Sequence, residues 1–190
     1  LKIRGVKVVH STIQRWVFKF SPMIEATMHK RKKQICDSWR MDETYIKVGG
    51  KDRYLYRAVD KQGNTVDFLL TKRRIKGSAQ KFLNKAIGNN GKPRLINIDK
   101  SGSNTEAIRI FNRHSLTFKK IKTRRVKYLN NIVEQDHRTI KRRIAITTGF
   151  KEFESAQRTL AGIEIINIIR KDQLSNSKKS WFATFKSLAA

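Results

Sequence analysis

The chain has 190 residues and carries 43 Lys and Arg against 15 Asp and Glu, so its formal net charge is +28. Its single cysteine excludes both a disulfide framework and a cysteine-rich zinc site. No apolar run reaches the ~18 residues of a membrane span, so we expect a cytoplasmic protein with no membrane partner. Such a positive excess repels itself unless a polyanion binds, which makes nucleic acid the first partner to consider.

Residues 1–22 are expected to form part of a helix-turn-helix DNA-binding segment. Apolar residues recur there with helical spacing, at Ile13, Trp16, Val17 and Phe20. The helix should end near Pro22, with Gly5 in the turn before it and Gln14 and Arg15 reading DNA. The first helix of the motif would precede the chain, so we expect an N-terminal truncation. A surface helix with basic decoration is the alternative.

The remaining elements follow in chain order after a connector at residues 23–38. Alternating and β-branched patterns predict three strands joined as a meander, at residues 39–48, 53–60 and 65–71. Two further strands are expected at 93–98 and 116–121. Helical patterns and caps predict helices at 78–87, 103–113, 130–146 and 152–170. Residues 175–190 carry little pattern and are expected to be loosely ordered.

This order of elements predicts an α/β fold. A meander followed by βαβ-type units gives a mixed five-stranded sheet with helices on both faces. Ligands of such sheets bind at the carboxyl ends of the strands.

Three carboxylates are harder to explain than the others in so basic a chain. Asp42 lies inside a strand, where Asp is disfavoured. Asp99 directly follows a buried-type strand, and Glu134 lies in the first turn of a helix. Taken singly, each could be a satisfied polar residue. A helix crossing the ends of two neighbouring strands could bring all three together.

Three clustered acids would repel one another unless a cation lay between them. Hard oxygen ligands favour Mg²⁺ or Mn²⁺ over zinc. Two such ions, roughly 3.5–4 Å apart, can hold the attacking and leaving oxygens of a phosphodiester. Arg138 and Lys141 follow Glu134 by four and seven residues, on the same side of the helix, and could reach a phosphate beside the metals. Both could equally belong to a solvated helix face.

A basic run at residues 113–127 contains seven Lys and Arg and no acid. We interpret it as a surface that holds the phosphate backbone of DNA, through Lys119, Lys120, Lys122, Arg124, Arg125 and Lys127. The alternative is a charged sheet edge that discourages strand pairing.

Several segments resemble bacterial transposases of insertion sequence family six. They are residues 39–47 (WRMDETYIK), 54–60 (YLYRAVD), 130–138 (NNIVEQDHR), 149–153 (GFKEF) and 156–164 (AQRTLAGIE). The resemblance implies a DDE catalytic domain at residues 39–174 with the ribonuclease-H-like fold of retroviral integrases. It also implies a metal triad of Asp42, Asp99 and Glu134, with Lys141 as the basic residue of the motif and Glu43 as a neighbour and not a ligand.

The function expected from this resemblance is metal-dependent DNA cleavage and strand transfer. The partners would be the ends of the element and the target DNA, with a homodimer or higher oligomer assembled on them in the bacterial nucleoid. Two alternatives stay open: an inactive DNA-binding remnant of a transposase, and a basic RNA-binding protein in which the acids are structural.

Overall fold

The fold was analysed in a computed structural model, which describes residues 2–3, 6–99, 102–113, 115–146 and 149–188. The chain divides into two compact units. One unit comprises Gln34–Lys151, and the other combines Leu1–Lys33 with Glu152–Ala190. Each unit is described by itself.

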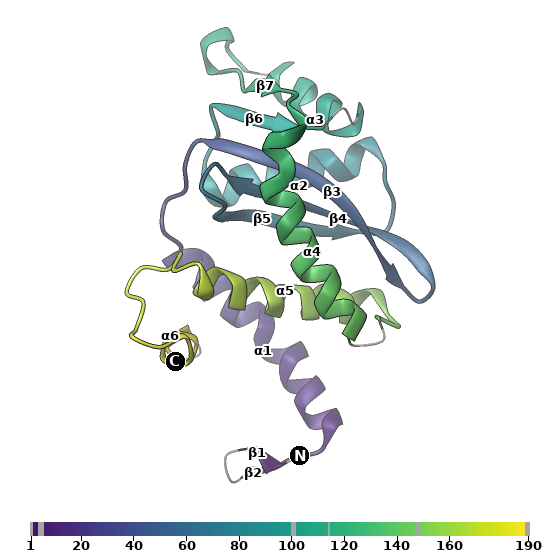
Figure 1. The fold of residues 1–190 in the computed structure, drawn as a ribbon, viewed down its shortest axis with the longest axis vertical. Coiled ribbons are helices and arrows are strands. Elements are labelled where there is room, and N and C mark those ends of the chain that lie inside the picture. The colour runs from purple at the N-terminus through teal and green to yellow at the C-terminus, as the bar shows by residue number, and fades with distance from the viewer. Residues whose placement is uncertain (1, 4–5, 100–101, 114, 147–148, 189–190) are drawn as a thin grey trace. The chain divides into compact units, whose positions relative to one another are not determined.

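The Gln34–Lys151 unit is built on a mixed five-stranded sheet (Figure 1). Its strands are β3 (Ser38–Val48), β4 (Lys51–Asp60), β5 (Thr65–Thr71), β6 (Leu95–Ile98) and β7 (Lys122–Arg124), in the order β5-β4-β3-β6-β7. Strands β3, β4 and β5 pair antiparallel, so the predicted meander is confirmed. Strand β6 lies parallel to both β3 and β7.

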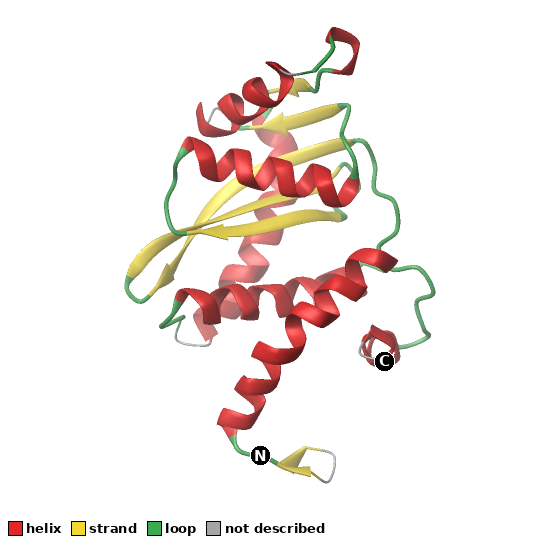
Figure 2. Cartoon of the chain, turned by 180° about the vertical axis from the view of Figure 1, so that it is seen from behind, coloured by secondary structure: helices red, strands yellow, loops and turns green. Residues whose placement is uncertain are grey.

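Helices cover both faces of this sheet. Helices α2 (Lys76–Asn90) and α3 (Gly102–Arg113) lie on the face seen in Figure 2, and α4 (Asn131–Ile146) crosses the opposite face, seen in Figure 1. Because successive side chains of a strand point to opposite faces of the sheet, each strand contributes residues to the packing on both faces. Trp39, Met41 and Ile96 pack with Phe82 of α2 and Ile108 of α3. The intervening residues of the same strands face α4.

The fifth strand lies further along the chain than the sequence predicts. The segment expected to be a strand, residues 116–121, contains instead a 3₁₀ turn at Thr117–Lys119, and β7 begins at Lys122. The side chain of Asn112 bonds both backbone groups of Ile121: its Nδ2 donates to the carbonyl oxygen at 2.9 Å, and its Oδ1 accepts from the amide at 2.8 Å. These bonds take the place of ladder pairing at Ile121, and pairing with β6 starts one residue later.

The amino-terminal segment also differs from the expected helix-turn-helix. A short hairpin of β1 (Lys2–Ile3) and β2 (Val6–Lys7) precedes one long helix, α1 (His10–Arg31), which continues through Pro22. Gly5, expected in the turn, lies outside the described residues. Proline removes one helical hydrogen bond. The second half of α1 compensates for it by packing, because Met28 is only 1% exposed.

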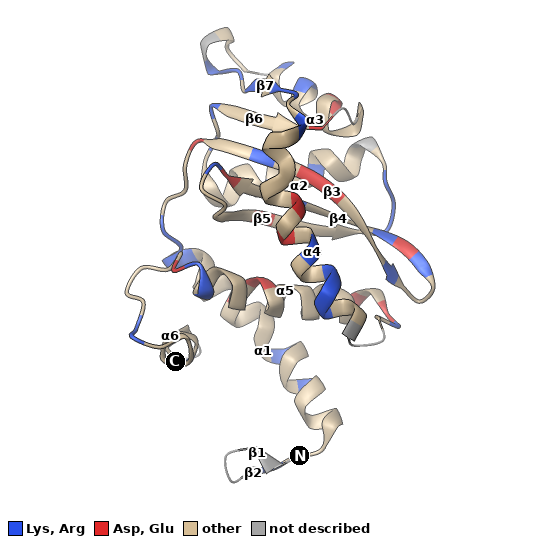
Figure 3. Cartoon of the chain, viewed as in Figure 1, with Lys and Arg blue, Asp and Glu red and all other residues tan. Residues whose placement is uncertain are grey.

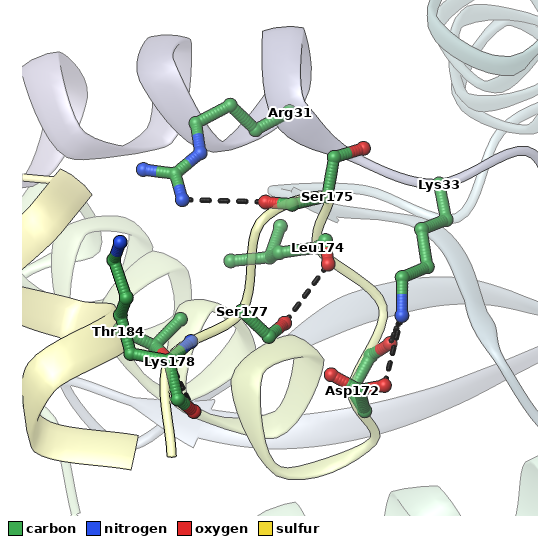
Figure 4. Close-up of polar contacts among 8 residues, drawn as sticks. All are labelled: Arg31, Lys33, Asp172, Leu174, Ser175, Ser177, Lys178 and Thr184. Atoms are coloured by element: carbon green, nitrogen blue, oxygen red, sulfur yellow. Dashed lines mark hydrogen bonds and ion pairs between the residues drawn. The ribbon is translucent and has the colours of Figure 1, made fainter. Parts of the chain in front are cut away.

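The second unit packs α1 against α5 (Phe153–Arg170) and α6 (Trp181–Leu188). Its core joins buried residues of all three helices and the segment between α5 and α6: Met28, Ile165, Ile168, Ile169, Leu174 and Leu188. Residues 175–190 were expected to be loosely ordered, yet they contain α6. The guanidinium of Arg31 donates to the carbonyl oxygen of Ser187 at 2.9 Å. It also donates to the carbonyl oxygen of Ser175 at 3.3 Å (Figure 4). Nearby, Lys33 pairs with Asp172 at 2.8 Å.

These compact units divide the chain at other residues than the expected segments, which end at residues 22, 38 and 174, and the extent of the expected catalytic domain stays a prediction. Helix α5, assigned from the sequence to the catalytic domain, groups with α1 because the apolar residues on its buried side contact α1 and α6. Among the described residues, no helix is both long enough and apolar enough to cross a membrane.

Candidate active site

The register of the sheet brings the first two acids to neighbouring positions. Strands β3 and β6 pair in parallel, and their last paired residues are Met41 and Ile98. Asp42 and Asp99 are the next residues on each chain. Since parallel strands lie about 4.8 Å apart, this register sets the two backbones next to each other. Alternation turns both side chains toward α4, away from the core that holds Met41 and Ile98.

Helix α4 carries the third acid across the same face. Its buried stripe has helical spacing, as the sequence predicted: Val133, His137, Ile140 and Ile144, all less than 10% exposed. Glu134 is half-buried beside this stripe in the first turn of α4. A negative charge at this position also interacts favourably with the dipole at the amino terminus of α4.

Asn97 fixes the start of α4 relative to β6. It is fully buried, and its Nδ2 donates to the Val126 carbonyl at 2.9 Å and to Oδ1 of Asn130 at 2.7 Å. Asn130 ends the 3₁₀ turn η2 (Lys127–Asn130), directly before α4. Asn97 precedes Asp99 by two residues, so one strand positions the second acid and, through these bonds, the helix that carries the third.

A second buried contact fixes the middle of α4. Arg57 of β4 is 0% exposed and stands opposite Asp42 in the β3–β4 register. Its Nη2 lies 2.9 Å from Oδ2 of Asp136 on α4 and donates to Oγ1 of Thr65 at 3.2 Å. A buried guanidinium is stable only when an opposite charge pairs with it. The ion pair between Arg57 and Asp136 therefore anchors α4 to β4, two residues after Glu134.

The electrostatics of Asp42 are those of a crowded carboxylate. Burial raises the pKa of Asp42 to about 7, against a lowering by a backbone hydrogen bond from Glu43, and the nearby carboxylates of Asp99, Glu134 and Glu43 raise it further. Nε2 of His137 lies 3.5 Å from Oδ2 of Asp42. Burial, followed by the charges of Arg57 and Lys141, lowers the pKa of His137 to about 3. The histidine is therefore neutral at pH 7 and adds no positive charge beside Asp42.

Asp99 and Glu134 lie close enough to Asp42 to raise its pKa, but the three acids are not gathered as ligands. Among the described residues, no three or more His, Cys, Asp and Glu side chains lie near enough together to hold a metal ion. The chemistry of the donors does fit a divalent cation, because carboxylate oxygens are the ligands that Mg²⁺ and Mn²⁺ prefer. A bound cation would also offset the neighbouring negative charges that raise the pKa of Asp42. Rotation of these side chains toward one point is what such a cation would require.

Glu43 belongs to the opposite face of β3. It stands opposite Tyr56 in the β3–β4 register and forms an ion pair with Arg74. The pKa of Tyr56 is raised, first by burial and then by the charge of Glu43. That Glu43 is a neighbour of the metal site and not a ligand stays a prediction.

The two basic residues predicted on α4 are both exposed. Nζ of Lys141 lies 4.7 Å from the centre of the Tyr45 ring, in a cation–π contact. Arg138 lies between Glu134 and Lys141 along the helix, so a row of one acid and two cations follows one side of α4. That these cations bind phosphate stays a prediction from the sequence.

The other predicted DNA contacts lie on several surfaces. Figure 3 shows basic segments at β7 and acidic ones on β3 and α4. Five residues of the basic run are exposed, and one is half-buried: Lys119, Lys120, Lys122, Arg125 and Lys127, with Arg124 half-buried. In the other unit, Gln14 and Arg15 are exposed on α1 and line a groove with Arg158 of α5.

Four residues of this region were missed or left undecided in the sequence. Asn97 and Arg57 appear as ordinary members of strands, and only the structure shows them buried against α4. Tyr45 was read only as part of the strand pattern. Arg74 is one of three consecutive cations in the sequence. Its hydrogen bond to Glu43 raises the pKa of Arg74, and the charge of Asp99 adds a smaller contribution, so Arg74 lies near the acids. A polar residue inside an apolar strand, such as Asn97 in LINI, was the one available signal.

Comparison with known proteins identifies the relatives of this chain. Residues 36–173 match the DDE domain of the IS240 type of transposase. The transposase for insertion sequence-like element IS431mec of Staphylococcus aureus (strain Mu50) is 40% identical over 176 residues, covering 90% of this chain and 75% of the relative. The transposase for insertion sequence element IS257 in transposon Tn4003 of Staphylococcus aureus has the same identity and coverage.

Solved structures confirm the predicted ribonuclease-H-like fold. The catalytic core domain of BIV integrase is similar with a TM-score of 0.52 and 18% identity, covering 80% of this chain and 94% of that one. A chain of the simian T-cell lymphotropic virus intasome, in complex with a PP2A regulatory subunit, is similar with a TM-score of 0.53 and 18% identity, covering 82% of this chain and 56% of that one.

Proposed function

The chain belongs to the DDE transposases of insertion sequences, and we propose that it cleaves DNA at the ends of its element and joins the freed 3′ ends to a target, using Asp42, Asp99 and Glu134 to hold two Mg²⁺ or Mn²⁺ ions. The observation that carries the proposal is the β3–β6 register, which makes Asp42 and Asp99 neighbours on the face that α4 crosses. The raised pKa of Asp42 supports it, since burial and the neighbouring carboxylates of Asp99, Glu134 and Glu43 disfavour a negative charge that a bound cation would stabilise.

Bound divalent ions would activate the attacking oxygen and stabilise the departing 3′ oxygen. The residues of the chain have the remaining tasks. Asn97 holds the turn before α4 and Arg57 holds the helix itself, which would keep Glu134 directed toward the two aspartates. Arg138 and Lys141 bind the phosphates that flank the scissile bond, and the ring of Tyr45 restrains the ammonium of Lys141.

We further propose that two or more copies act together on DNA in the bacterial cytoplasm, because an element has two ends to be cut. The net charge of +28 supports DNA as the partner. In this proposal, the basic run of residues 119–127 and the side chains of Gln14 and Arg15 contact the DNA backbone.

A nicking and strand-joining assay with Mg²⁺ or Mn²⁺ on element-end DNA tests this function. Asp99→Asn is expected to abolish both reactions while leaving DNA binding within about twofold, because one side chain at the acid site changes and the basic surfaces do not. Equal activity of the parent and Asp99→Asn would remove the acids from the reaction.

A second candidate is DNA binding without catalysis. It is favoured by the finding that the described residues hold no three-membered cluster of possible metal ligands. It predicts that the parent chain binds DNA but neither nicks nor joins it with either metal ion.

A further inference from the structure

The basic run does not form one surface, because β7 sends its side chains to both faces of the sheet. In the β6–β7 register, Arg124 stands opposite Asn97 and Thr123 opposite Ile96. Asn97 faces α4, and Ile96 packs in the core under α2 and α3. By alternation, Arg124 is on the side of the carboxylates, whereas Thr123 and Arg125 are on the side of α3.

On the α3 side, the exposed cations border a groove of about 590 Å³. Its lining comes from α3 and from the chain around β7: Thr105, Ile108, Arg109, Asn112, Arg113, Lys120, Thr123 and Arg125. Arg109 is paired with Glu106 at 2.7 Å. Arg113, Lys120 and Arg125 are exposed, and they have no ion pair among the residues that the structure describes. Three uncompensated charges around one groove are costly unless an anion binds there.

The groove is held in shape by buried contacts. Asn112, in its lining, makes the two hydrogen bonds to Ile121 that fix the loop before β7. Ile121 itself is 3% exposed in the core, and the amide of Lys122 donates to the Arg94 carbonyl at 2.9 Å. The cations are therefore carried on segments whose backbone is already ordered, which lowers the cost of binding.

We propose that this groove binds the backbone of a second segment of duplex DNA, distinct from the segment at the carboxylates. The proposal rests on the function proposed above. Helix α3 and helix α4 cover opposite faces of the sheet (Figures 1 and 2), so the groove and the acids face different ways. None of the described lining residues is aromatic or acidic. The groove thus offers cations for phosphates but no ring for stacking unpaired bases.

The test replaces the three unpaired cations together, in Arg113→Gln/Lys120→Gln/Arg125→Gln. The matched control, Lys51→Gln/Lys61→Gln/Lys151→Gln, removes the same charge from exposed residues outside the groove. Binding of a 20-base-pair duplex is measured against salt concentration by fluorescence anisotropy. Each phosphate contact contributes about 0.9 to the slope of log K against log salt, so losing three lowers the slope by about 2.7. Between 50 and 200 mM salt, that slope difference corresponds to about 40-fold in affinity.

The same variants are then compared in nicking and in joining to a second duplex. At low salt, the groove variant is expected to slow joining at least tenfold more than it slows nicking, whereas the control keeps both rates within about twofold of the parent. A parallel loss of nicking and joining would place one DNA segment across both surfaces and overturn the proposal. So would a salt slope equal to that of the control.

If the parent neither nicks nor joins DNA, the proposed function fails. The salt slopes of the groove variant and the control still decide, in that case, whether the groove binds DNA. Unfolding temperatures of all three proteins check the fold, and they should agree within about 2 °C because every substituted side chain is exposed.

Discussion

Replacing Asp42 by asparagine should stabilise the metal-free protein at alkaline pH. The folded pKa of Asp42 is about 7, against an ordinary value of 3.8. The folded state therefore holds the Asp42 proton more tightly than the unfolded state. This contribution to stability is complete below pH 3.8 and is lost as the pH rises through 7. At full ionisation the cost is about 4 kcal/mol, from a pKa difference of roughly three at about 1.36 kcal/mol for each pH unit.

The uncharged amide of the Asp42→Asn variant would carry no such cost, so the advantage of the variant over the parent should grow with pH. Between pH 5 and pH 8 it should increase by about 2–3 kcal/mol, equivalent to roughly 5–10 °C in unfolding temperature for a chain of this size. Urea unfolding of both proteins in EDTA, at pH 5, 6, 7 and 8, measures it. Because His137 is unchanged in the two proteins, its own titration cancels in the difference. An advantage that stays constant from pH 5 to pH 8 would refute the reasoning.

Three further predictions concern the supports of the site. Asn97→Leu should lower the free energy of unfolding by about 2–3 kcal/mol in urea, because it leaves buried polar groups of the following loop unsatisfied; an unchanged midpoint would contradict this. Arg57→Met should lower the free energy of unfolding by about 3 kcal/mol, because it removes the cation that pairs with Asp136. Adding Asp136→Asn should recover part of this loss. If nothing is recovered, the loss does not come from the ion pair. Lys141→Gln should lower the salt slope of DNA binding by about 0.9, whereas Tyr45→Phe, which keeps the ring, should leave it unchanged.

The sheet was largely predictable because its signals are local. The meander has alternating strands separated by Gly-containing turns, and its three strands fall within a few residues of the expected positions. The same holds for α4, whose stripe of Val133, His137, Ile140 and Ile144 is buried as its spacing predicts.

The errors occur where distant contacts override a local pattern. Leu116 and Ile121 suggested a strand, but Asn112 takes the backbone bonds of Ile121. Pro22 suggested the end of a helix, but the packing of Met28 against α5 and α6 stabilises the longer helix. The tail gained a helix for the same reason, since Leu188 enters that core.

In the candidate site, too, the sequence shows the local features but not the contacts between distant residues. Asp42, Asp99 and Glu134 stood out in the sequence because acids are rare in so basic a chain, and the order of the elements suggested that β3 and β6 are neighbours in the sheet. The contacts that position them could not. The partnership of Arg57 with Asp136 and that of Asn97 with Asn130 each join residues at least 33 positions apart, with no spacing rule to reveal them.

Binding of Mn²⁺, measured by calorimetry on the parent and on single variants, tests the convergence of the three acids most directly. We expect Asp42→Asn, Asp99→Asn and Glu134→Gln each to weaken Mn²⁺ binding at least tenfold, and Glu43→Gln, on the opposite face of β3, to change it less than threefold. Mn²⁺ affinity that survives any one of the first three substitutions would contradict a site shared by all three carboxylates.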